Sequence, residues 1–198
     1  ATQMGLGRKT GIDLPNEDPG LIPSSEWKRR VYKTAWFPGE TISVAIGQGA
    51  VGVTPLQAAW AMGGLASGGR LKQPHLVDPE TIKKLGLEAR DIKSEDYPLH
   101  QTTVDLISKG MWGVVNEEGG TGGKARIEGF DVAGKTGTAQ VVGKEANLKG
   151  EGYEDHAWFV GFAPYRNPEI VVGAFIENGG FGGTAAAPVA HAIMDTYY

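Results

Sequence analysis

The sequence contains no cysteine and no long apolar run. Without cysteine among its 198 residues, the chain cannot use a thiol nucleophile, a disulfide framework or a cysteine-ligated metal site. No stretch reaches the roughly 18 apolar residues of a membrane-spanning helix, and none forms the apolar core of a signal peptide. Because the first residue is Ala1 and not a methionine, we expect a piece of a longer protein, with any membrane anchor outside it.

An excess of positive charge is missing as well. The formal net charge is −4, and the only dense basic run, Lys28-Arg29-Arg30, is too short to follow a phosphate backbone. We therefore expect no nucleic-acid partner and interpret the run as a solvated surface. The hydrophobic content of 40% suffices for one cored domain, or for a large part of one.

Two helices have clear signals. At the first, Thr54 is suited to cap the amino terminus, Pro55 fits the first helical position and Gln57 completes a capping box. The second is predicted over 102–115, where apolar residues recur at helical spacing and a Gly-Gly pair follows. No long helix is expected before residue 54, and residues 68–100 have the composition of a surface excursion.

The last third of the chain carries the strand signals. The predicted strands are 132–142, 157–163 and 170–177. A short turn-forming segment, 164–168, predicts that the last two form an antiparallel pair. Charged, glycine-rich residues 143–155 predict a mobile loop, and a closing helix is expected over 184–198. We therefore predict an α+β fold, an antiparallel sheet flanked by helices.

One segment, GFDVAGKT at 129–136, is compatible with two unrelated motifs. It matches the phosphate-loop pattern G-x-x-x-x-G-K-[ST]; its continuation, KTGT at 135–138, matches the lysine-threonine-glycine motif of serine enzymes that penicillin acylates. A phosphate loop needs a cradle of backbone N–H groups followed by a helix. Here bulky Phe130 and anionic Asp131 occupy the cradle, and strand-forming residues follow Lys135. This context disfavours nucleotide binding.

The strand context suits the second motif. On an edge strand, Lys135 can supply a positive field, and Thr136 or Thr138 can donate a hydrogen bond to a carboxylate. Gly137 has no Cβ, so a peptide can lie against the strand and pair with its backbone. The residues themselves therefore favour a peptide carboxylate over a nucleotide phosphate as the ligand.

Further blocks extend the second motif across most of the chain. They are GLGRKTGIDLP at 5–15, IGQG at 46–49 followed by TPLQ at 54–57, GKTGTAQ at 134–140, HAWFVGFAP at 156–164 and the tail at 185–193. In sequence and in order, these blocks resemble the carboxyl-terminal half of a class B penicillin-binding protein, most closely the elongation type. Several blocks in one order are far more specific than a single motif.

The resemblance implies that residues 1–198 are the carboxyl-terminal part of one transpeptidase domain, a serine β-lactamase/transpeptidase-like sandwich. In this family an acyl-enzyme serine joins peptidoglycan stem peptides. Lys135 and Thr138 would be catalytic, and Thr136 and Gly137 would contact substrate with Thr138. The Thr138 hydroxyl would bind the donor carboxylate, and its N–H would form half of an oxyanion hole. Such a donor can lower a barrier by roughly 3–4 kcal/mol.

The same family needs a nucleophilic Ser-x-x-Lys motif and a Ser-x-Asn motif. No Ser-x-Asn is present, and the one Ser-x-x-Lys, from Ser25 to Lys28, lies in a charged, proline-flanked stretch. A lysine base must lose its proton near neutral pH, which requires burial or matched charges. The sequence around Lys28 offers no apolar helix to bury it. We therefore expect Ser25 to be an ordinary surface serine and the nucleophile to lie outside this chain.

The resemblance also implies the setting of the intact protein. Its ligands would be stem peptides and β-lactams. Its partners would be the remainder of its own domain and a membrane glycosyltransferase of the elongation machinery. It would act on the periplasmic side of the bacterial inner membrane, without a cofactor or metal. Two rivals stay open: a β-lactam sensor or serine β-lactamase, which shares the lysine-threonine-glycine strand, and a non-catalytic cell-wall scaffold. The upstream sequence and the deacylation rate separate them.

Overall fold

A three-stranded antiparallel sheet forms the centre of the computed structural model, which describes residues 1–88, 91–141 and 152–198. Strand β3 (Ala133–Ala139) pairs with β4 (His156–Ala163), and β4 pairs with β5 (Ile170–Ile176). Within the described part of the chain, β3 lies at one edge of this sheet. The predicted strands and the antiparallel pair are confirmed. Most of the loop predicted over 143–155 lies outside the described residues.

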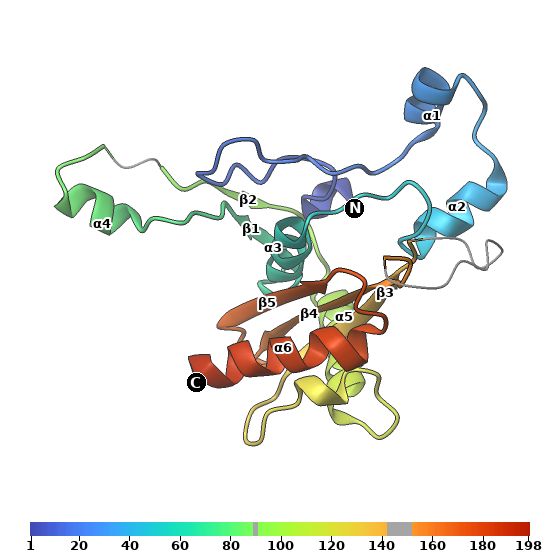
Figure 1. The fold of residues 1–198 in the computed structure, drawn as a ribbon. Helices are drawn as coiled ribbons and strands as arrows, with labels where there is room; N and C mark the ends of the chain where they lie inside the picture. Colours follow the sequence, from blue (N-terminus) through green and yellow to red (C-terminus); the bar gives the residue numbers. More distant parts are fainter. Residues whose placement is uncertain (89–90, 142–151) are drawn as a thin grey trace.

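Helix α6 (Gly182–Tyr197) covers one face of the sheet, as Figure 1 shows. Ala190 and Met194 of this helix are fully buried in a cluster that includes Phe159 of β4. Strand side chains alternate between faces, so Phe162, three residues further on, points to the opposite face. Full burial of one such large apolar side chain stabilises the fold by roughly 1.5–3 kcal/mol.

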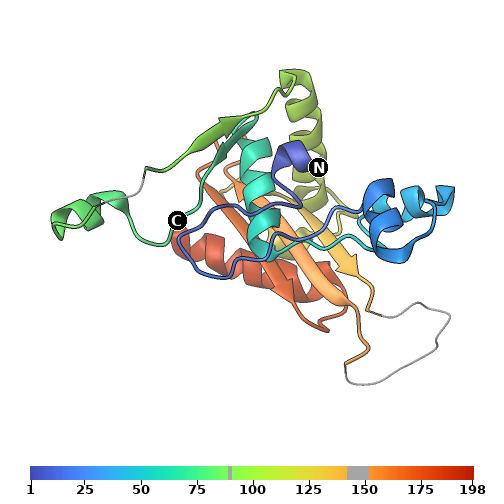
Figure 2. The same ribbon diagram turned by 90° about the horizontal axis from the view of Figure 1, so that it is seen from above.

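Helices α3 (Pro55–Ala66) and α5 (Gln101–Asn116) cover the opposite face (Figures 1 and 2). Leu65 of α3 and Met111 of α5 are buried there together with Phe162. The sheet therefore lies between two helical layers, and the predicted α+β fold with a helix-flanked antiparallel sheet is confirmed. Both predicted helices are present, as is the closing helix.

The capping box at the start of α3 has a second role. The Thr54 hydroxyl accepts from the Gln57 N–H at 3.1 Å, and Gln57 Oε1 accepts from the Thr54 N–H at 3.0 Å. Gln57 is fully buried, and its Nε2 donates to the carbonyls of Arg8 and Pro19, both at 2.7 Å. One capping residue thus ties the amino-terminal segment to the sheet domain.

The remaining elements are short, and most project from the sheet and its helices. Figures 1 and 2 show α4 on one side of this body and the α1–α2 pair on the other. Strands β1 and β2 form a two-stranded ribbon in the predicted surface excursion. The bounds are η1 Thr2–Met4, α1 Ser25–Tyr32, α2 Pro38–Ala45, β1 Arg70–Lys72, α4 Pro79–Lys84, β2 Ser94–Asp96 and η2 Gly123–Ala125.

The basic run in α1 departs from the expectation of a fully solvated surface. Arg29 and Arg30 are exposed, but Lys28 is only 8% exposed. Its Nζ donates to Glu40 of α2 and lies 4.2 Å from the centre of the Phe37 ring. The chain reverses between α1 and α2 and covers the lysine with residues that follow it by 9 and 12 positions. The sequence next to Lys28 therefore did not indicate its burial.

Several large apolar side chains stay on the surface. Among them are Phe37, Ile42, Ile46, Leu106 and Phe181, each 59% exposed or more. Within the described ranges, no helix combines the length and apolar character needed to cross a bilayer.

Candidate active site

The KTGT motif at 135–138 lies on β3, along an edge of the sheet. After Lys135 the chain continues as a strand to Ala139, whereas a phosphate loop requires a helix at this point. The interpretation as a nucleotide site therefore fails. An edge strand instead exposes a row of backbone N–H and C=O groups to which an extended peptide can add.

The backbone groups of Thr136 and Thr138 face the free edge. Gly137 is paired with Trp158 of β4, and a Cβ placed on Gly182 would lie 2.5 Å from the Gly137 oxygen and 2.1 Å from the Trp158 oxygen. The carbonyl oxygens of Gly137 and Trp158 are therefore close to each other. This closeness indicates that Gly137 and Trp158 point their N–H and C=O groups at each other across the two strands. In an antiparallel pair the next residue on either side directs its groups away from the partner strand.

Lys135 and Thr136 direct their side chains to opposite faces of β3, because strand side chains alternate. Lys135 is exposed, and its Nζ donates to the carbonyl oxygen of Thr136 at 2.6 Å. The Thr136 hydroxyl is 2.7 Å from the hydroxyl of Thr121, with which it shares a hydrogen bond. The structure therefore brings Lys135 to the free edge and engages the Thr136 hydroxyl with the glycine-rich segment that follows α5.

The carbonyl of Thr138 also has a partner. Gln48 Nε2, from the segment between α2 and α3, donates to it at 3.1 Å. Two residues of this edge, Thr121 and Gln48, were not singled out by motif reasoning. Each of the two residues lies between two glycines in the sequence, and Gln48 is part of IGQG at 46–49. Flanking glycines are the sequence signal that could have marked both positions as exposed and tightly turned.

The start of α6 packs directly behind the motif. A Cβ on Gly183 would lie 2.1 Å from the carbonyl oxygen of Thr121, and Gly182 has the close contacts with Gly137 and Trp158 given above. Only glycine permits this approach of a helix to backbone. The two glycines therefore set the position of β3 and of the segment that holds Thr136.

Ser25 and Lys28 do not form an active site in this structure. Ser25 is exposed at the first position of α1, as expected for a surface serine. Lys28 donates to Glu40, and this hydrogen bond, followed by one from the Phe37 N–H, holds the pKa of the Glu40 carboxyl below its usual value. Lys28 is thus engaged with a carboxylate of α2 and not with Ser25.

His156, at the head of β4, has a structural arrangement. Its Nδ1 accepts from the N–H of Asn178 at 3.0 Å, and its ring meets Phe175 edge-on, with centroids 5.3 Å apart. Asn178 has a φ of 51°, in the left-handed region, so the histidine fixes the turn that follows β5.

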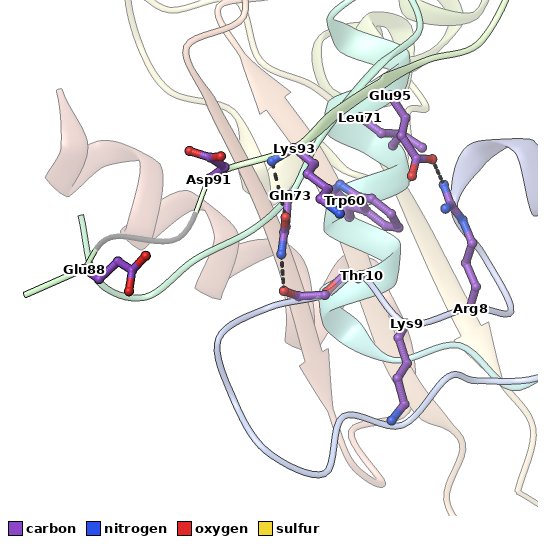
Figure 3. Close-up of a pocket in the computed structure, with 11 residues that line it drawn as sticks. Arg8, Lys9, Thr10, Trp60, Leu71, Gln73, Glu88, Asp91, Lys93 and Glu95 are labelled. Atoms are coloured by element: carbon purple, nitrogen blue, oxygen red, sulfur yellow. Dashed lines mark hydrogen bonds and ion pairs between the residues drawn. The ribbon is translucent and has the colours of Figure 1, made fainter. Parts of the chain in front are cut away.

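A separate hollow of about 690 Å³ lies between the amino-terminal segment and the β1–β2 ribbon, as Figure 3 shows. Arg8 crosses its wall, stacks 5.2 Å from the centre of the Trp60 ring and pairs with Glu95 at 2.6 Å. The hydrogen bond from Arg8 lowers the pKa of Glu95. Gln73 bridges the two walls by donating to Gly11 and accepting from the Lys93 N–H. These contacts hold the amino-terminal segment against the β1–β2 ribbon. Strand β3 contributes no residue to the lining of this hollow.

Metal ligation has no support in the described ranges. There, no three or more His, Asp or Glu side chains are grouped so that they could hold an ion.

A lysine-threonine-glycine strand at the edge of an antiparallel sheet, with helices on both faces, defines the serine β-lactamase/transpeptidase-like fold. The sequence model of the penicillin binding protein transpeptidase domain matches residues 1–195, and the chain belongs to this family.

Named relatives agree with this assignment. The peptidoglycan D,D-transpeptidase MrdA of Haemophilus influenzae is 40% identical over 98% of this chain and 31% of its own length. Penicillin-binding protein 2 of Pseudomonas aeruginosa, solved in complex with WCK 5153, superposes with a TM-score of 0.80 at 36% sequence identity. The match covers 99% of this chain and 42% of the P. aeruginosa chain. Penicillin-binding protein 2 of Helicobacter pylori, solved in complex with MreC, superposes with a TM-score of 0.79 at 30% sequence identity. The match covers 100% of this chain and 35% of the H. pylori chain. The chain thus spans about a third of the curated relatives' length.

Proposed function

We propose that the intact protein is a peptidoglycan D,D-transpeptidase, which cross-links stem peptides through an acyl-serine intermediate and is itself acylated by β-lactams. The observation that carries this proposal is the KTGT motif on a sheet edge that no strand of the described chain covers. The backbone of Thr136 and Thr138 is directed outward there, and side chains alone, those of Lys135 and Gln48, contact its carbonyls. Such an edge can receive an extended peptide by strand addition. The identity with MrdA supports this reaction over others of the same fold.

In this proposal residues 1–198 supply the carboxyl-terminal part of the transpeptidase domain, and the nucleophilic serine belongs to the part outside this chain. The extent of the match supports it, because this chain covers only 42% of the P. aeruginosa protein chain. The pairing of Lys28 with Glu40 supports it too, because the lysine of the one Ser-x-x-Lys in the sequence is engaged with Glu40 and not with Ser25.

The proposed chemistry assigns a role to each group of the edge. The serine oxygen attacks the carbonyl of the penultimate D-alanine, a tetrahedral oxyanion forms, and the terminal D-alanine leaves with a proton on its amine. The Thr138 N–H, directed outward with its carbonyl, stabilises the oxyanion. The Thr138 hydroxyl binds the terminal carboxylate, and the Lys135 ammonium adds a positive field. Thr136 and Gly137 complete the binding strand. An acceptor amine then attacks the acyl-serine ester, the new amide forms as the bond to the serine oxygen breaks, and the proton that the amine loses returns to the serine.

We also propose where the protein acts and with what. Its site is the periplasmic side of the bacterial inner membrane, beside the remainder of its own domain and a membrane glycosyltransferase of the elongation machinery. The H. pylori relative in complex with MreC supports assembly with another protein.

The test is a transfer assay with the purified intact protein. A donor peptide that ends in D-Ala-D-Ala and an amine acceptor should give cross-linked product and free D-alanine in equal amounts, and benzylpenicillin should abolish both. Rapid hydrolysis of penicillin without cross-linked product would identify a β-lactamase. A protein that forms no product and takes up no penicillin would be a scaffold.

A further inference from the structure

A glycine-flanked turn after α2 presents one side chain, that of Gln48, to β3. Gly47 and Gly49 have φ angles of 72° and 73°, in the left-handed region that favours glycine. A Cβ on Gly47 would contact nothing within 4 Å, so the backbone conformation and not packing calls for glycine there. The Gln48 N–H donates to the Ser43 carbonyl at 2.9 Å, which fastens the turn to the end of α2.

The Gln48 carboxamide reaches a strand 90 positions further along the chain. Its Nε2 donates to the carbonyl oxygen of Thr138 at 3.1 Å. The only neighbour that β3 has in the described sheet is β4, on its other side, and β3 ends at Ala139, one residue after Thr138. The outer side of the strand at Thr138 is therefore held by a side chain and not by a further strand.

This contact restricts the rotation of the groups that the reaction uses. A hydrogen bond to the Thr138 carbonyl fixes the peptide plane that follows Thr138, because the peptide unit is planar. With β4 holding Gly137 on the other side, the backbone of Thr138 is fixed before and after its Cα. The direction of the Thr138 N–H and that of its Cα–Cβ bond, which carries the hydroxyl, are then fixed.

We propose that Gln48 is a positioning residue for the acyl-transfer reaction, acting through Thr138. Its carboxamide holds the Thr138 carbonyl and thereby aims the Thr138 hydroxyl at the donor carboxylate, while β4, paired with Gly137, holds the peptide plane that contains the Thr138 N–H. This inference rests on the proposed function, and it adds a residue that the lysine-threonine-glycine motif does not contain. A hydroxyl held in advance needs no reorganisation during the reaction, which is the condition for strong electrostatic stabilisation of the bound carboxylate.

Gln48→Glu in the intact protein tests the inference. Glutamate keeps the shape of glutamine, but as a carboxylate it cannot donate to the carbonyl. The rate constant of acylation by benzylpenicillin, followed by intact mass, should fall at least about tenfold, the size of effect expected when a catalytic donor loses its support. Gln48→Met, uncharged and similar in length, should lower the rate in the same way. Gln3→Glu, a change at an exposed residue of η1, should not.

A double-mutant cycle with Thr138→Val separates positioning from a general loss of structure. If Gln48 acts through the Thr138 hydroxyl, which valine removes, Gln48→Glu should change acylation by less than about threefold in the Thr138→Val background, because coupled residues are not additive. Equal effects in both backgrounds, or Gln48→Glu and Gln48→Met variants that acylate like the wild type, would overturn the inference and leave the proposed function intact. A wild-type protein that takes up no penicillin would overturn both.

Discussion

Thr138 of β3 carries three hydrogen-bonding groups. Its carbonyl is held by Gln48, its N–H faces the same side, and its hydroxyl is the one polar side-chain atom that it can offer to a ligand. Thr136 differs, because its hydroxyl shares a hydrogen bond with Thr121. This difference makes Thr138 the better candidate for binding a carboxylate, although both residues belong to the same motif.

Thr138→Val should therefore slow penicillin acylation of the intact protein while leaving its fold intact. Valine keeps the backbone N–H and the branched shape but removes the hydroxyl. A hydrogen bond to a charged group contributes about 1.5–3 kcal/mol, so the acylation rate constant should fall about 10- to 100-fold. Thr103→Val, at an exposed position of α5, is the matched control. Acylation at the wild-type rate would remove Thr138 from the carboxylate site.

Some single residues could be assigned from sequence, and others could not. Thr54, Pro55 and Gln57 act within four positions of one another, so their capping pattern is readable in one dimension. Lys28 is covered by Phe37 and Glu40, and the Gln48 contact with Thr138 spans 90 positions. Such contacts depend on how the chain folds back on itself, and local periodicity contains no information about them.

At the scale of elements, the junction of α6 with β3 positions the candidate site. The helix begins at Gly182, directly over the Gly137–Trp158 pair, and its second residue contacts the Thr121 carbonyl. Strand periodicity predicted β3 and the closing helix separately. Their close contact depends on two glycines whose role is not visible until the two elements are placed together.

Gly182→Ala should destabilise the protein and displace β3. The added methyl group would overlap two backbone oxygens that no side-chain rotation can move away. Overpacking of this kind costs about 1–3 kcal/mol of the free energy of unfolding, measurable by urea titration. Gly110→Ala, at an exposed position of α5 where a Cβ meets nothing within 4 Å, should instead stabilise by about 0.5–1 kcal/mol. Equal responses of the two variants would contradict the proposed close packing.

The α1–α2 pair should weaken in acid. The hydrogen bond from Lys28 lowers the pKa of Glu40 in the folded protein. A carboxyl with a lowered folded pKa contributes stability above its unfolded pKa, about 4.3, and loses it as the pH falls through the folded value. Urea titrations at pH 6 and pH 3 should show a smaller fall in unfolding free energy for Glu40→Gln than for wild type. For Glu118→Gln, a change at an exposed residue, the free energy of unfolding should fall as much as it does for the wild type. If it fell equally steeply for Glu40→Gln, Glu40 would make no such contribution.

At the scale of the whole molecule, the sheet and its two helical layers followed from sequence, because helix and strand periods and capping signals agree with the observed elements. The positions of the projecting segments did not follow from sequence, since apolar side chains such as Ile42 and Ile46 remain exposed there and give no local signal for the placement of these segments. The site could be predicted only in part: the KTGT strand was found from its motif, whereas Thr121 and Gln48 required the tertiary structure.

We infer that this chain carries the binding strand of an acyl-serine enzyme whose nucleophile lies outside residues 1–198. To test this, the mass of the intact protein is measured after exposure to excess benzylpenicillin, and the modified residue is located by peptide mapping. One adduct per molecule is expected, on a serine outside residues 1–198. An adduct on Ser25, or a protein that remains unmodified, would show that the nucleophile has been misplaced or that the protein is not an acyl-serine enzyme.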